Sequence, residues 1–194
     1  MNRNKDSPAS QRKKRSTKKC LCYIVAGVIL QTAIILLFVL TVMRIRNPKV
    51  RFGDITVETL SANSSSSSSS FSMKLHAQVT VKNTNFGHFK FQDSVATISY
   101  RGSPVGEVLI GNARAKARST KKINVTMNLS SAKVSMKSQL GSDMNSGKLT
   151  LTSQATLSGK IHLFKIIKKK KSARMNCTMD VNTKTKAIEN LKCK

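Results

Sequence analysis

The sequence predicts a mainly β fold, in which a single membrane-spanning helix is followed by an antiparallel β-sandwich with one short helix. Three observations predict this class. Residues 20–43 form an uncharged apolar run, residues 44–194 alternate apolar and polar side chains with a period of two, and one short interval changes to a spacing of four. A length of 194 residues allows one domain with an appendage.

The apolar run is long enough to cross a bilayer. As a helix, residues 20–43 would extend about 36 Å, and a hydrocarbon core is about 30 Å thick. A secretory signal peptide is the alternative, but its apolar region is usually about 7–15 residues long and ends at a small-residue cleavage site. The sequence Thr41-Val42-Met43-Arg44 has no such site. We therefore interpret residues 20–43 as a transmembrane signal anchor.

The net charge of +27 divides unequally around this run. Residues 1–19 carry eight Lys or Arg and one Asp, which leaves +7 on the tail and +20 on residues 44–194. Because cytosolic flanks are the more basic, we expect residues 1–19 to be a cytosolic tail and residues 44–194 to be an exoplasmic domain. This topology argues against a nucleic-acid partner. The expected location is the plasma membrane, and the endoplasmic reticulum or another endomembrane is the alternative.

The four cysteines fall into two pairs. Cys20 and Cys22 lie at the membrane boundary, where they are candidate S-acylation sites or else ordinary apolar filler. Cys177 and Cys193 are separated by fifteen residues and would lie in an oxidising compartment. A disulfide between them would contribute about 3 kcal/mol, and two buried thiols are the alternative.

Four N-x-[ST] sequons are candidate N-glycosylation sites. Alternation around Asn124 and Asn128 places both side chains on the solvent face of a strand, opposite Ile123, Val125, Met127 and Leu129. Asn63 is a further candidate, and Asn176 is the poorest because Cys177 is its middle residue. The same alternation places Asp180 with Asn176 on a solvent face.

Strand patterns recur through the exoplasmic segment. The clearest covers 71–82, and others lie near 50–60, 94–101, 104–111, 121–129, 147–157, 159–166, 173–182 and 186–193. Ala132, Met136 and Leu140 after two serines predict one helix over 131–140, crossing between sheets. The serine run 64–70 predicts a flexible loop between the first two strands.

The basic run Lys168–Lys171 lies between two strand patterns, so we expect it at a hairpin tip. It is either an ordinary solvated turn or a basic contact surface for acidic wall polysaccharide or anionic lipid.

Catalytic and cofactor-binding patterns are missing from the sequence. The acids of residues 44–194 are scattered singly, and no histidine has a second ligand at zinc-like spacing. Residues 102–106 read G-S-P-V-G, an order that does not match a nucleophile elbow. We therefore expect no enzyme activity, metal or cofactor. A type II glycan-processing enzyme would require Asp93, Glu107 or Asp180 to converge with a histidine.

Residues 79–109 carry a combination of motifs in a fixed order. Val81-Lys82-Asn83-Thr84-Asn85 precedes Phe89 and Phe91, and Tyr100-Arg101-Gly102 precedes Val105-Gly106. This order, with Gly159, Ile161, Cys177 and Cys193 further on, resembles the late embryogenesis abundant proteins with a WHy-type domain. The membrane-anchored harpin-induced-like and non-race-specific disease resistance-like plant branch is the most similar. Thr84 replaces the family's proline.

The resemblance implies a fibronectin-III-like β-sandwich and a role in plant stress or defence response, and it implies no catalytic residue. We expect a non-catalytic surface protein whose partners are its membrane, an acidic polymer or lipid, and other membrane proteins. The alternative is a lipid-binding module with an apolar groove between the sheets.

Overall fold

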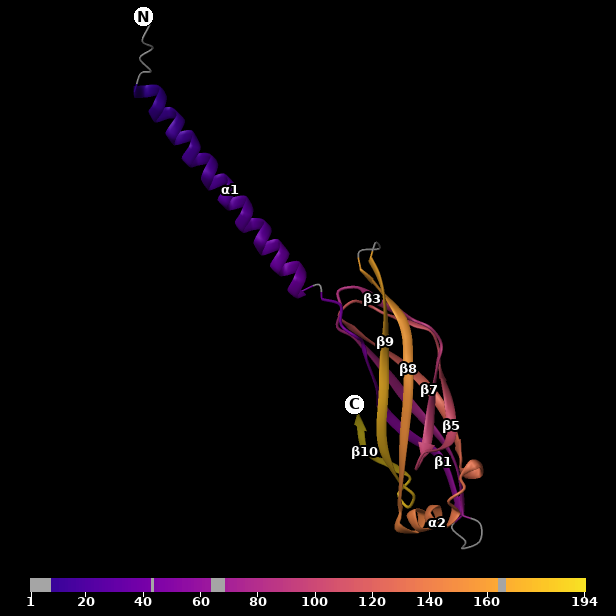
Figure 1. The fold of residues 1–194 in the computed structure, drawn as a ribbon. Coiled ribbons are helices and arrows are strands. Elements are labelled where there is room, and N and C mark those ends of the chain that lie inside the picture. The colour runs from indigo at the N-terminus through magenta and orange to yellow at the C-terminus, as the bar shows by residue number, and fades with distance from the viewer. Residues whose placement is uncertain (1–7, 43, 64–68, 164–166) are drawn as a thin grey trace, which may run out of the picture. The chain divides into compact units, whose positions relative to one another are not determined.

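The computed structural model describes residues 8–42, 44–63, 69–163 and 167–194. It divides into two units, Met1–Arg44 and Ile45–Lys194. The expected serine loop falls largely outside the described residues, as do 164–166 of the strand expected over 159–166. The fold class that the sequence predicts is confirmed, because the second unit is an antiparallel β-sandwich with one short α-helix (Figure 1).

The first unit contains one helix, α1 (Pro8–Val42). Its segment Cys20–Leu40 has a mean hydropathy of 2.6 and is long enough to cross a membrane. The polar Thr32 side chain donates hydrogen bonds to the carbonyls of Val28 (3.0 Å) and Ile29 (2.8 Å). Length and composition suit a membrane span, although a signal sequence near an N-terminus meets the same criteria.

The smaller sheet contains three strands in the order β1-β2-β7. These are β1 (Lys49–Asn63), β2 (Ser70–Asn83) and β7 (Ser119–Ser130). Alternation over 71–82 is confirmed, because Phe71 through Val81 bury every second side chain while the residues between them face outward. The same holds for β7, in which Val125, Met127 and Leu129 are buried.

The larger sheet contains seven strands and has the main path β10-β9-β8-β3-β6. These five strands are β10 (Ala187–Cys193), β9 (Ile167–Asn182), β8 (Lys148–Leu163), β3 (His88–Phe91) and β6 (Ala113–Ala115). The other two, β4 (Ser94–Tyr100) and β5 (Ser103–Ile110), pair with each other, and β4 also pairs with β8. The sequence did not predict β3 and β6, because strands of four and three residues show too little periodicity.

The inward faces of the two sheets form one apolar core. Leu75 and Met127 of the smaller sheet are fully buried, as are Ile98 and Leu151 of the larger sheet. A lipid-binding groove between the sheets would have to expose these side chains. The filled core therefore counts against the lipid-binding alternative.

The crossing between the sheets differs from the expected helix over 131–140. A short 3₁₀ turn, η1 (Ser131–Lys133), is followed by α2 (Lys137–Ser146), so the α-helix begins about six residues later than expected. Ser130 caps only η1, by accepting a hydrogen bond from the Ala132 N–H. Leu140 and Met144, four residues apart, form the buried face of α2. The helix ends at Gly147, which adopts the left-handed conformation.

The strands expected over 147–157 and 159–166 form one continuous strand, β8. Gly159 lies at the junction of the two expected strands, and in the structure it packs against β3. A Cβ at Gly159 would lie 2.3 Å from the Lys90 carbonyl oxygen and 2.6 Å from a ring carbon of Phe89. The glycine therefore permits close packing rather than a turn.

Candidate functional site

Four cations lie side by side across the outer face of the larger sheet. Arg114 on β6 pairs with Lys90 on β3, Lys90 pairs with Lys160 on β8, and Lys160 pairs with Lys170 on β9. Paired residues of antiparallel strands project to the same face, and neighbouring strands are about 4.8 Å apart. We call Arg114, Lys90, Lys160 and Lys170 the cationic row; its backbone positions span about 14 Å.

The cationic row has no acidic counterpart among the described residues. All four side chains are exposed. The ion pairs in the described part of the chain join Lys74 and His76 to Glu58, Arg101 to Asp143, and Lys148 to Asp180. Like charges directly opposite one another destabilise a sheet. The row therefore works against the stability of the fold that carries it.

A second row runs parallel to the first, two residues along each strand. His88 pairs with His162, which pairs with Lys168. The two imidazole rings stack with centroids 5.5 Å apart and an interplanar angle of 8°. Arg114 donates from Nη2 to Nδ1 of His88 (3.3 Å), which requires an unprotonated Nδ1.

The surroundings favour the neutral form of both histidines. Desolvation lowers the pKa of His88 below its ordinary value, and the charges of Arg114, His162 and Lys90 lower it further. Desolvation also lowers the pKa of His162, with further contributions from Lys90, Lys168, Lys160 and Arg114. Acidification would therefore add positive charge beside the cationic row.

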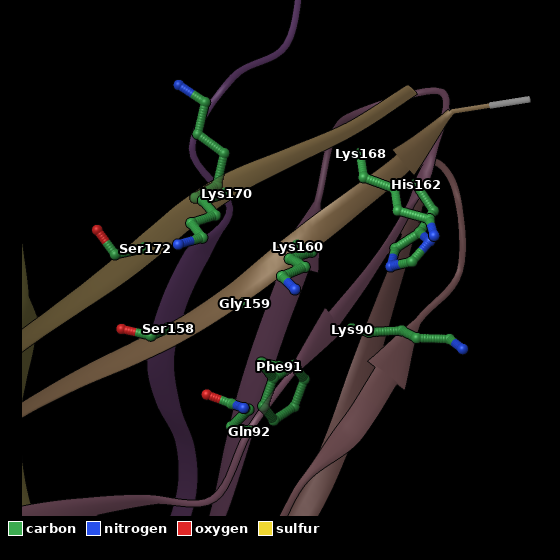
Figure 2. A pocket seen from close by; sticks show the side chains of 11 residues that line it. Lys90, Phe91, Gln92, Ser158, Gly159, Lys160, His162, Lys168, Lys170 and Ser172 are labelled. Carbon is green, nitrogen blue, oxygen red and sulfur yellow. The ribbon is translucent and has the colours of Figure 1, made fainter. Parts of the chain in front are cut away.

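A surface groove of about 680 Å³ lies along three residues of the cationic row, all except Arg114 (Figure 2). Lys90, Lys160 and Lys170 line it from three neighbouring strands. Ser158, Ser172 and Gln92 supply uncharged polar groups on one side, and His162 with Lys168 lies on the other. Phe91 is the one phenyl ring in the lining, and it is only 3% exposed. The groove is thus a polar, cationic surface whose accessible ring is the imidazole of His162, stacked on His88.

The placement of Lys168–Lys171 at a hairpin tip was wrong. All four belong to β9 and pair with β8 from His162 to Gly159. Lys168 and Lys170 share the outward face, whereas Lys169 and Lys171 pair with Ile161 and Gly159 of the alternate set. Lys171 nevertheless lines the groove with Lys168 and Lys170. Four identical residues hide the period of two, so the sequence could not reveal this division.

The structure joins Cys177 and Cys193 by a disulfide between β9 and β10. Cys20 and Cys22 in α1 are exposed free thiols, as S-acylation would require. The sequon asparagines Asn63, Asn124, Asn128 and Asn176 are all exposed. Use of these sites stays a prediction.

Asp180 does not face solvent as expected; it is only 7% exposed. It accepts hydrogen bonds from Thr150 (2.7 Å) and Asn190 (3.0 Å) and pairs with Lys148 (3.1 Å). Burial by itself would raise the pKa of Asp180, but these three partners together lower it. Asp180 lies on β9, and these contacts connect it to β8 and β10, so its role is structural.

One histidine does meet a carboxylate on the smaller sheet. His76 contacts Glu58 through Nε2 (2.7 Å) and the Thr126 hydroxyl through Nδ1 (3.1 Å). Such a hydroxyl–imidazole–carboxylate chain has the order of a catalytic triad. However, it lies on an open sheet face, where β2 and β7 pair along their whole length. An oxyanion site needs free backbone donors, which a paired ladder does not offer.

The asparagines of the motif at 81–85 fix the chain where it enters the sandwich. The buried Asn83 side chain donates to the carbonyls of Gly87 (2.8 Å), Ala115 (3.3 Å) and Lys116 (2.9 Å). Asn85 accepts from the Arg46 N–H (2.6 Å) and donates to its carbonyl (2.8 Å). Both asparagines therefore cap backbone groups.

The remaining motif residues also have structural roles. Arg101 and Gly102 adopt positive φ angles of 46° and 86° in the turn between β4 and β5. A Cβ at Gly106 would lie 2.7 Å from the Asn128 carbonyl oxygen, so the glycine allows β5 to pack closely on β7. The motif therefore specifies the fold rather than a reaction.

The family of the chain follows from comparison with known proteins. Residues 78–179 match the family model described as late embryogenesis abundant protein, and this range includes the motif, β7 and most of the larger sheet. The chain belongs to the late embryogenesis abundant family. A family member from Arabidopsis thaliana, late embryogenesis abundant protein At1g64065, is 30% identical over 179 residues, covering 90% of this chain and 82% of the relative.

Three solved structures are similar to this late embryogenesis abundant chain at low identity. AT1g01470 from Arabidopsis thaliana is 13% identical, with a TM-score of 0.44, over 71% of this chain and 84% of that one. The putative late embryogenesis abundant protein At2g46140.1 is 13% identical, with a TM-score of 0.30, over 92% and 94%. A protein from Archaeoglobus fulgidus is 10% identical, with a TM-score of 0.34, over 66% and 94%.

Proposed function

We propose that this late embryogenesis abundant protein is a single-pass, non-catalytic membrane protein that displays its β-sandwich on the exoplasmic side of the plasma membrane. The observation that carries the proposal is the apolar segment Cys20–Leu40, with a mean hydropathy of 2.6, ahead of the family's sandwich in the sequence. Eight basic residues before this segment favour a cytosolic N-terminus.

The role that we propose is in plant stress or defence response, as in the WHy-type, harpin-induced-like branch that the motif at 79–109 resembles. Support comes from the resemblance of the motif, whose residues stabilise turns and close strand packing here. The sandwich then acts by contact. Its net charge of +20 would attract acidic polymers or anionic headgroups over a range of about 8 Å at physiological ionic strength.

Alkaline extraction with protease protection tests the anchor and its orientation. The full chain, tagged at its N-terminus, is placed in sealed vesicles whose cytosolic face is outward. We expect it to stay in the alkali-washed membrane, with the tag digested and residues 44–194 protected. Release by alkali, or loss of residues 1–43 by cleavage, would indicate a signal sequence instead. Digestion of the sandwich with the tag protected would reverse the topology.

A further inference from the structure

The cationic row is the feature that folding does not explain. Lys160 faces Lys90 on one side and Lys170 on the other, and Lys90 also faces Arg114. Each opposed pair of like charges costs stability, and no described acidic side chain pairs with the row. Surface charges away from a functional site are usually mixed in sign. Four aligned cations therefore indicate a ligand that carries several negative charges in a line.

The lining of the groove distinguishes between classes of polyanion. Single-stranded nucleic acids stack their bases on exposed aromatic faces, but Phe91 is buried and the His162 ring already stacks on His88. A membrane-docking surface combines cations with exposed apolar side chains, and the described lining includes none. Ser158, Ser172 and Gln92 instead offer hydroxyl and amide groups beside the lysines (Figure 2). This combination suits a polymer that carries both carboxylates and hydroxyls.

We propose that the cationic row binds a linear acidic polysaccharide of the polyuronate type, which lies across β6, β3, β8 and β9. Successive carboxylates accept charge-assisted hydrogen bonds from Lys90, Lys160 and Lys170. Sugar hydroxyls bond to Ser158, Ser172 and Gln92. The inference rests on the proposed function in one respect, the exoplasmic location of the sandwich, because such a polymer would be met in that compartment.

The histidine row next to the cationic row makes the site sensitive to pH. His88 faces Arg114, Lys90 and His162, and His162 faces Lys90, Lys160, Lys168 and Arg114. These cations favour neutral imidazoles in the free protein, and a bound carboxylate favours the protonated form. Binding therefore takes up protons, and affinity rises as the pH falls from about 7 to 5.

A pair of charge-matched variants tests the site. One replaces Lys90, Lys160 and Lys170 with Gln, and the control replaces Lys82, Lys121 and Lys122, which are exposed on the smaller sheet. Both lose three positive charges. The full chain is held in nonionic detergent micelles, and its affinity for soluble polygalacturonate is measured. We expect the row variant to lose affinity about tenfold and the control to lose much less.

Equal losses in the two variants would overturn the proposal, because they would indicate attraction to net charge alone. Preferential binding to phosphatidylserine vesicles or to single-stranded DNA, reduced specifically in the row variant, would replace the polysaccharide with that ligand. Thermal unfolding of both variants confirms that each is folded. In detergent the sandwich is accessible whatever its orientation in a membrane. A failed binding experiment therefore counts against the polysaccharide site, and a failed protease-protection experiment counts against the proposed topology.

Discussion

Replacing Lys160 with Gln should stabilise the fold while it weakens the proposed site. Lys160 stands directly opposite two like charges, Lys90 and Lys170. Such cross-strand pairs are each worth about 0.2–1 kcal/mol, so removing both raises the free energy of unfolding by about 0.4–2 kcal/mol. Because Lys160 is exposed, solvent screening keeps the gain toward the lower part of this range.

Lys122→Gln is the matched control, because Lys122 pairs only with Thr80 at the edge of the smaller sheet. It should change the free energy of unfolding by less than about 0.5 kcal/mol. Urea unfolding of the full chain in micelles measures both variants at low salt and at about 1 M NaCl, where the Debye length falls to about 3 Å.

We expect Lys160→Gln to raise the free energy of unfolding at low salt and to leave it unchanged at high salt. Destabilisation by this variant, or a gain that does not depend on salt, would refute the argument that the row opposes folding. Stabilisation that accompanies loss of polygalacturonate binding would identify Lys160 as a residue retained for function at a cost in stability.

Three further predictions concern the rest of the fold. Asn83→Ala removes the donor to three carbonyl groups and should lower the free energy of unfolding by about 3 kcal/mol in the same urea assay; an unchanged midpoint would contradict the structural role of the motif. Removing the disulfide with Cys177→Ala and Cys193→Ala should cost about 3 kcal/mol, and reductant should then have no further effect on unfolding. Because the pKa values of His88 and His162 are lowered in the folded protein, the unfolded chain binds more protons below about pH 6.5. The two histidines therefore contribute stability above that pH, and acidification removes it. Replacing both with Gln should reduce the loss of stability at low pH, and a pH profile of unfolding that does not change would contradict this prediction.

The sequence predicted the faces of strands well wherever the alternation was long. The buried face of β2, from Phe71 to Val81, could be predicted from a period of two alone. The pairing of Cys177 with Cys193 could be predicted from their compartment and their spacing in the sequence. The position of α2 was wrong because Ala132 and Met136 imitate a helical stripe, whereas burial of Leu140 and Met144 decides where the helix lies.

The candidate site was only partly predictable. Lysine density drew attention to 168–171, but the cationic row depends on strand register, and Lys90, Lys160 and Lys170 are far apart in sequence. Lys160 and Lys170 each lie three residues from the pair Leu163 and Ile167, so the register of β8 with β9 aligns them. The pairing of β3 with β8 had no comparable signal, because β3 is only four residues long.

Carbodiimide cross-linking tests the central claim most directly, because it joins a carboxylate to an amine that it already contacts. The full chain in micelles is treated with oligogalacturonate and carbodiimide, and the modified lysines are identified by peptide mass spectrometry. We expect adducts concentrated on Lys90, Lys160 and Lys170, with few on Lys82, Lys121 and Lys122, which are also exposed. Adducts spread evenly over both sets would contradict it.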